Sequence, residues 1–147
     1  MIVSTKGRFA LRLMVDLAQH AEEEKCSLKE IAERQDLPLK YLEQIVAMLN
    51  KAGLIRSTRG YRGGYHLNKP AADYTAGEIL RATEGSMLVL PCLDGEQPPC
   101  EQRGTCVTLP FWSGLQNAID SYMDSVTLED LILQYEEASA EGEHYVL

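Results

Sequence analysis

Residues 27–67, SLKEIAERQDLPLKYLEQIVAMLNKAGLIRSTRGYRGGYHL, hold the clearest structural pattern in the chain. Ser27 lies three residues before Glu30, which is the spacing of a capping box at the start of a helix. Leu28 and Ile31 then fall on one helical face. The pattern predicts a short helix of about two turns.

A second helix follows from Pro38, a residue that suits a first helical position. Its apolar residues recur at i, i+3, i+4 and i+7, as in an amphipathic helix, and they are Leu42, Ile45, Val46 and Leu49. The helical pattern ends at Gly53. With these residues turned inward, the outer face and its flanks carry Lys40, Tyr41, Glu43, Gln44 and Lys51. Lys, Glu and Gln are side chains that read phosphates and base edges in a DNA major groove.

Two short strands are predicted after this helix, Ile55–Thr58 and Gly64–Leu67. The turn between them contains Arg59, Gly60 and Arg62. A basic hairpin beside a recognition helix is a winged helix-turn-helix. The alternative is an ordinary helical hairpin with solvated charges, because short helix-turn-helix patterns also arise by chance.

The charges are divided between the two halves of the chain. Residues 1–70 hold 12 Lys and Arg against 8 Asp and Glu, whereas residues 71–147 hold 2 against 14, within a net charge of -8. The front half is therefore expected to bind a polyanion, and the acidic rear half is expected to stay away from it. The predicted DNA-contacting residues are Lys6, Arg8, Ser27, Lys40, Tyr41, Glu43, Gln44, Lys51, Arg59, Gly60 and Arg62.

The first residues run into Lys6 and Arg8 without the apolar core of a signal peptide. The uncharged run 105–119 is too short and polar to span a bilayer. We therefore expect a cytoplasmic protein without a membrane partner. In that compartment its four cysteines are metal ligands, sensors or core residues rather than structural disulfides.

The expected fold class is mainly α, with a winged helix-turn-helix DNA-binding domain (1–85) and a long C-terminal dimerisation helix. A cysteine-containing sensor loop (86–109) precedes the dimerisation helix and a final capping helix (110–137), and an acidic tail (138–147) ends the chain. The long helix begins at Pro110. Its apolar stripe predicts a homodimer, which would match the two-fold symmetry of a palindromic operator. The stripe consists of Trp112, Leu115, Ile119, Tyr122 and Val126. Packing of this stripe on its own domain is the alternative.

Three cysteines lie close together in the sensor loop. Seven residues separate Cys92 from Cys100, and five separate Cys100 from Cys106. Three thiolates at this spacing can meet at one soft metal centre, either an iron-sulfur cluster or zinc. A thiol redox switch and a set of inert cysteines are further interpretations of the same spacing.

Four segments together resemble the Rrf-two family of bacterial winged-helix transcriptional regulators. They are residues 4–10 (STKGRFA), 41–44 (YLEQ), 59–65 (RGYRGGY) and 77–79 (GEI), and the resemblance extends from Ser4 to about Glu137. It implies a dimeric transcription factor that binds double-stranded DNA. In several members the three cysteines hold an iron-sulfur cluster, of the 2Fe-2S or 4Fe-4S type. Leu109 stands where cluster-binding relatives have a histidine ligand.

These observations favour a DNA-binding transcriptional regulator, a repressor, that senses iron, redox state or cluster supply through Cys92, Cys100 and Cys106. One rival is a cluster-free regulator of the cysteine-metabolism type, which responds to thiols or a partner protein. A rival from a different class is an iron-sulfur redox carrier. An enzyme is not expected, because neither a glycine-rich substrate motif nor an acid-base constellation stands out.

Overall fold

The computed structural model describes residues 3–23, 26–60, 63–95, 101 and 103–142. The described chain is mainly helical, with one two-stranded antiparallel sheet. The elements are α1 (Thr5–Gln19), α2 (Leu28–Gln35), α3 (Leu39–Lys51), β1 (Ile55–Thr58), β2 (Gly64–Leu67), η1 (Ala71–Asp73), α4 (Ala76–Glu84), η2 (Pro91–Leu93), η3 (Arg103–Thr105), α5 (Leu109–Ser125) and α6 (Leu128–Ala140). The two strands have the predicted bounds, whereas α5 begins one residue before Pro110 and α6 continues three residues past Glu137.

The core forms where α1, α2 and α3 turn their apolar faces toward one another. Leu13 of α1, Ile31 of α2 and Leu42 of α3 are each fully buried. The predicted capping box is present at the start of α2: the Glu30 amide donates to the Ser27 hydroxyl, and the Ser27 amide donates to the Glu30 carboxylate. Helix α3 starts at Leu39, so Pro38 is the cap residue rather than the first helical one.

A buried carboxylate joins α1 to α2. Asp16 is 1% exposed, and its two oxygens accept hydrogen bonds from Arg34 Nη2 at 2.6 Å and Arg34 Nε at 3.1 Å. Gln35 Nε2 donates to the same carboxylate at 2.9 Å. The paired carboxylate raises the pKa of the Arg34 guanidinium above its usual range. This two-pronged pairing fixes α2 against α1 and so sets the start of the helix-turn-helix.

The hairpin packs against the chain just before α2. Its register pairs Ile55 with Leu67 and Thr58 with Gly64. The Tyr65 amide donates to the Cys26 carbonyl at 3.0 Å, and a Cβ at Gly64 would lie 2.7 Å from that same oxygen. Only glycine allows this approach of two backbones, which seats the wing beside the helix-turn-helix.

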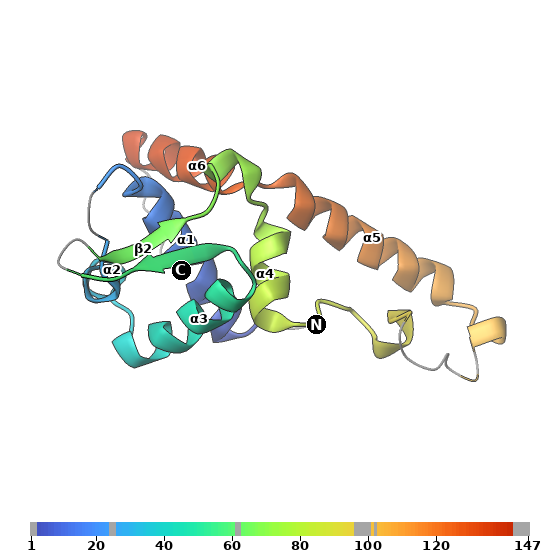
Figure 1. Ribbon diagram of the computed structural model, residues 1–147. Coiled ribbons are helices and arrows are strands. Elements are labelled where there is room, and N and C mark those ends of the chain that lie inside the picture. The colour runs from blue at the N-terminus through green and yellow to red at the C-terminus, as the bar shows by residue number, and fades with distance from the viewer. Residues whose placement is uncertain (1–2, 24–25, 61–62, 96–100, 102, 143–147) are drawn as a thin grey trace.

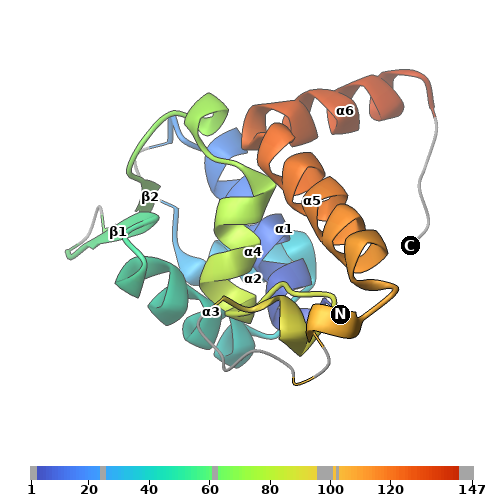
Figure 2. The same ribbon diagram turned by 90° about the vertical axis from the view of Figure 1, so that its right-hand side faces the viewer.

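Beyond α4 the chain runs outward and then returns as α5, which forms an arm pointing away from the helix-turn-helix (Figure 1). Gln116 of α5 is 7% exposed and holds the outgoing segment. Its Oε1 accepts from the Val89 amide at 2.7 Å, and its Nε2 donates to the Met87 carbonyl at 3.1 Å. Figure 2 shows α5 and α6 on the other side of α4 from α3 and the hairpin.

The last helix returns to the first domain. Thr127 and Asp130 cap the start of α6, with both capping-box hydrogen bonds present. Leu128 is fully buried in the core that α1, α2 and α3 share. Within the described ranges, no helix is long and apolar enough to cross a membrane.

We expect Asp16→Ala to lower the free energy of unfolding by about 2–3 kcal/mol, because it removes the acceptor of three charge-assisted hydrogen bonds and leaves Arg34 without its carboxylate. Glu33→Ala, at an exposed position of α2, is the matched control and should change stability by no more than about 0.5 kcal/mol. Urea unfolding measures both. Equal stabilities of the two variants would contradict the structural role of Asp16.

Candidate nucleic-acid interface and cysteine segment

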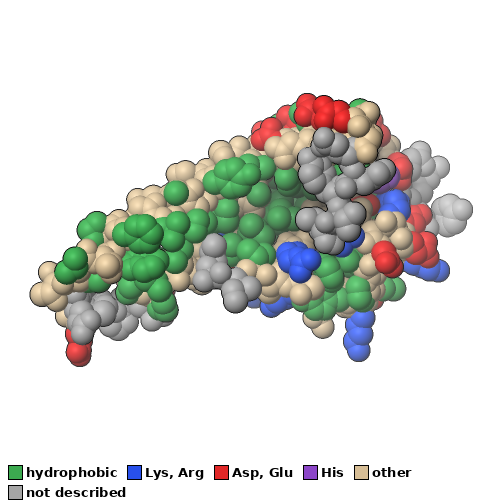
Figure 3. Space-filling model, turned by 180° about the vertical axis from the view of Figure 1, so that it is seen from behind, with side chains coloured by type: hydrophobic (Ala, Val, Ile, Leu, Met, Phe, Trp, Pro, Cys, Tyr) green, Lys and Arg blue, Asp and Glu red, His purple; other side chains and the backbone are tan. Residues whose placement is uncertain are grey.

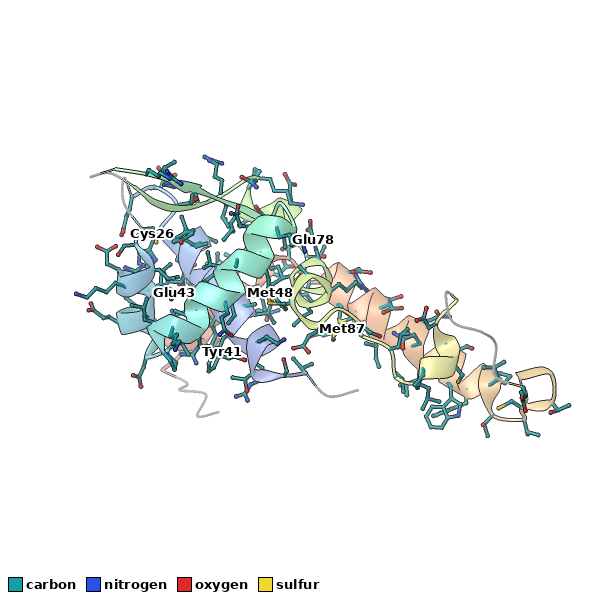
Figure 4. The ribbon with its side chains drawn as sticks, turned by 60° about the horizontal axis from the view of Figure 1, so that its bottom comes forward. Cys26, Tyr41, Glu43, Met48, Glu78 and Met87 are labelled. Carbon is teal, nitrogen blue, oxygen red and sulfur yellow. The ribbon has the colours of Figure 1, made fainter. Side chains whose placement is uncertain are left out.

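The outer face of α3 is open along its length. Lys40, Glu43, Gln44 and Lys51 are all exposed. Tyr41 is half-buried, and its ring meets the ring of Phe9 edge to face, with centroids 5.6 Å apart and planes at 87°. Figure 4 looks onto this helix and shows Tyr41 and Glu43 toward its N-terminal end. The face is therefore free to enter a groove, with its N-terminal turn braced by α1.

The start of α1 is held by a residue from far along the chain. Glu84 Oε1 accepts hydrogen bonds from the Ser4 amide at 2.9 Å and the Gly7 amide at 3.0 Å, and from the Ser4 hydroxyl at 2.5 Å. A Cβ at Gly7 would lie 2.5 Å from this oxygen. A carboxylate at a helix N-terminus satisfies amides that otherwise lack acceptors. Lys6, which is half-buried, and the exposed Arg8 project from this fixed turn.

The tip of the wing carries the exposed Arg59 and Gly60, which has φ 101°. Arg62 lies outside the described residues. Ser27 uses its hydroxyl to accept from the Glu30 amide at 3.2 Å, so the structure gives this predicted DNA contact a capping role. Its contact with DNA stays a prediction.

The cysteines have different surroundings. Cys92 lies on η2 and is half-buried, and Cys106 is exposed just before α5. The Thr108 hydroxyl, 3.6 Å from the Cys106 sulfur, and the Thr108 amide lower the pKa of the Cys106 thiol. Cys100 lies outside the described residues, so the arrangement of all three thiols stays a prediction. Among the described residues, no three His, Cys, Asp or Glu side chains are grouped to hold a metal ion.

Leu109 is the first residue of α5 and is half-buried. The fourth cysteine, Cys26, belongs to the core. It is 2% exposed, its sulfur accepts from Arg34 Nη2 at 3.5 Å, and burial raises the pKa of its thiol. Cys106 and Cys26 are thus chemically distinct, because Cys106 is exposed and its thiol pKa is lowered, whereas Cys26 is buried and its thiol pKa is raised.

The predicted dimer stripe is divided between two faces of α5. Leu115 and Tyr122 are exposed, at 36% and 71%. Ile119 packs toward Leu80, Met87 and Met123, and Val126 is half-buried where its carbonyl accepts from the Ala76 amide at 2.8 Å. Trp112 is half-buried, and its Nε1 donates to the Thr108 hydroxyl at 3.2 Å.

Two residues of the arm escaped the sequence analysis. Phe111 is 63% exposed and lies one helical turn before Leu115, so it extends the exposed apolar face that Figure 3 shows along the arm. Its i, i+4 spacing from Leu115 was a usable signal. Gln116, which binds the outgoing segment, gave no signal in the sequence, because a glutamine in a helix is normally expected to face solvent.

This architecture matches a known protein family. The family model described as "Rrf2: Iron-dependent Transcriptional regulator" matches residues 3–134. The chain belongs to the Rrf2 family of transcriptional regulators. It is therefore a regulator of transcription and not an enzyme, and the mainly α winged-helix fold class is confirmed.

The relatives that resemble this chain include regulators named IscR and regulators named CymR. The regulator IscR of Photorhabdus laumondii is 35% identical over 142 residues, which cover 97% of this chain and 85% of IscR. The solved structure of T. potens IscR is 40% identical, covering 94% of this chain and 90% of that one, with a TM-score of 0.74. The structure of CymR, the global cysteine regulator of B. subtilis, is 36% identical, covering 91% and 98%, also with a TM-score of 0.74.

Proposed function

We propose that this Rrf2-family chain is a cytoplasmic homodimeric repressor that binds a palindromic operator and senses iron, redox state or cluster supply through an iron-sulfur cluster. The observation that carries the DNA-binding part is the open face of α3, which lies beside the start of α1 and the wing. These three elements supply Lys40, Arg8 and Arg59 from separate segments, all of them exposed.

Charge supports this orientation toward DNA. Helices α5 and α6 lie on the other side of α4 from the recognition helix (Figure 2). They carry acidic residues such as Asp120, Asp124 and Glu129. Phosphates would repel that side and attract the side with the basic residues, which orients the protein before it makes base contacts.

The dimer would form through the exposed apolar face of the arm. Phe111, Leu115 and Tyr122 lie at intervals of four and seven residues on α5, and each is at least 36% exposed. Such a face, extended away from the domain (Figure 3), is well suited to meet its own copy across a two-fold axis. Two recognition helices would then face two half-sites of one operator.

The cluster would be held by Cys92, Cys100 and Cys106. The lowered pKa of Cys106 supports this, because the thiolate is the form that ligates iron. Cys92 lies on the segment that Gln116 clamps to α5. The charge of a bound iron-sulfur cluster changes with its redox state, and its integrity depends on oxygen and iron supply.

The chain's own residues would carry that signal to DNA. A rearrangement around Cys92 would strain the hydrogen bonds of Gln116 to Met87 and Val89, and so shift α5 against α4. In a homodimer this shift would change the separation of the two recognition helices. A population shift between two such separations is enough to change operator affinity.

The relative CymR supports a second candidate within the same family, a cluster-free regulator that responds to thiols or a partner protein. The specific observation in its favour is Leu109, whose side chain cannot ligate iron. The redox-carrier alternative has weaker support, because it gives no purpose to the wing and the open face of α3.

We expect Arg59→Ala and Glu43→Ala to affect DNA binding in different ways. Arg59→Ala should weaken binding to all sequences and reduce the salt slope by about one for each subunit, because it removes a phosphate contact. Glu43→Ala should cost little affinity but relax the preference for one base by roughly 1–3 kcal/mol. Fluorescence anisotropy with selected and scrambled duplexes at several salt concentrations measures both effects.

Gln134→Ala, an exposed change on α6 that alters no charge, is the control and should leave both quantities unchanged. A Glu43→Ala protein that lost all affinity while keeping its base preference would contradict the assignment of Glu43 as a discriminating residue.

Anaerobically purified protein should be coloured and contain iron and sulfide, because three thiolates are available to one cluster. Cys92→Ser and Cys106→Ser should each remove most of the visible absorbance, whereas Cys26→Ala, in the core, should retain it. Absorption spectra with iron and sulfide analysis measure this. Colourless wild-type protein that still binds its operator would reject the cluster in favour of the CymR-like alternative.

A further inference from the structure

A broad, shallow hollow of about 480 Å³ lies between the first turns of α1 and α3. It is lined by Thr5, Phe9, Pro38, Lys40, Tyr41 and Gln44. The edge-to-face rings of Phe9 and Tyr41 and the ring of Pro38 give it apolar walls, while Lys40 and Gln44 stand at its polar side.

The hollow opens where a recognition helix reads bases. The N-terminal residues of such a helix contact base edges in the major groove. Lys40 is the second residue of α3, and Gln44 lies one turn further on the same exposed face. An apolar surface at this point needs an apolar partner on DNA. Among the groups that the four bases display in the major groove, the C5-methyl of thymine is the apolar one.

The neighbouring side chains favour the same partner. A glutamine amide pairs in two places with N6 and N7 of adenine, and a lysine contacts a phosphate or a guanine edge. Gln44 beside an apolar hollow therefore matches a step that contains both adenine and thymine. The Phe9–Tyr41 contact also links the two helices, so the hollow keeps its shape when α3 enters the groove.

We propose that this hollow is a specificity site for one thymine methyl group in each operator half-site, with Phe9 and Tyr41 as its receiving surface. The proposal rests on the proposed DNA-binding function and adds the base that the site selects. Phe9 thereby becomes a specificity residue although it belongs to α1 and not to the recognition helix.

The test uses the full chain and a duplex obtained by selection from random sequences. Each thymine in one half-site, and then in both, is replaced by deoxyuridine, which keeps base pairing and removes only the methyl group. At one position, we expect the loss of the methyl to weaken binding about fourfold for each half-site, since burial of one methyl contributes about 0.8 kcal/mol. Fluorescence anisotropy gives the ratio of the two dissociation constants.

Phe9→Ala should bring the thymine-to-uracil ratio at that position close to one, and Phe9→Leu should keep part of it. Because Phe9 packs on the core, circular dichroism checks folding, and Thr5→Asp provides a second variant. Thr5 is exposed at the first position of α1, where a carboxylate suits the helix. General repulsion of phosphates by the introduced carboxylate lowers the affinity for the thymine duplex and for the deoxyuridine duplex alike. Only a change at the hollow alters the ratio of these two affinities.

The proposal is overturned if the protein binds its selected duplex and no thymine methyl matters, or if a sensitive position is unaffected by Phe9→Ala and Thr5→Asp. Absence of any sequence-specific DNA binding would instead reject the proposed function.

Discussion

The pairing of Asp16 with Arg34 and Gln35 is the constraint on which the proposed DNA-binding surface depends. A carboxylate that is 1% exposed costs free energy unless its oxygens are satisfied, and here two neighbouring residues of α2 satisfy them. The result is a fixed angle between α1 and α2. Because α3 follows α2 after a short turn at Asp36, with φ 52°, its direction is set from the same place.

Two further contacts carry this constraint to the remaining parts of the surface. The backbone of Gly64 lies against Cys26, immediately before α2, which ties the wing to the helix-turn-helix. Glu84, the last residue of α4, holds the first turn of α1. The segment that leads to the cysteines begins directly after Glu84. A change in that segment therefore starts next to the residue that positions Lys6 and Arg8.

The sequence was sufficient for the parts of the fold that rest on local patterns. The bounds of β1 and β2 were predicted because turn residues and apolar runs mark both ends, and the capping box of α2 was predicted from spacing alone. At α4 the Thr75 hydroxyl accepts a hydrogen bond from the Glu78 amide, but the Glu78 carboxylate pairs with Lys69 Nζ at 3.0 Å. A long-range partner of this kind leaves no local signal.

The candidate site was predictable to the same extent. The exposed face of α3 follows from helical periodicity, whereas the roles of Glu84, Gln116 and Phe9 depend on contacts between distant segments. The apolar residues of α5 formed one stripe in the sequence, but in the structure Ile119 faces Met87 and Met123, while Phe111 joins the exposed side. Hydrophobicity alone does not show which side of an amphipathic helix is covered by its own domain.

In the proposed function, two copies of this chain place their recognition helices in successive major grooves of one operator. Hydroxyl-radical footprinting of the full chain on a selected operator tests it most directly. We expect two symmetric protected patches whose centres lie about 34–36 Å apart, or a multiple of that distance. A single patch without symmetry, at protein concentrations that saturate the site, would contradict the dimeric reading of DNA.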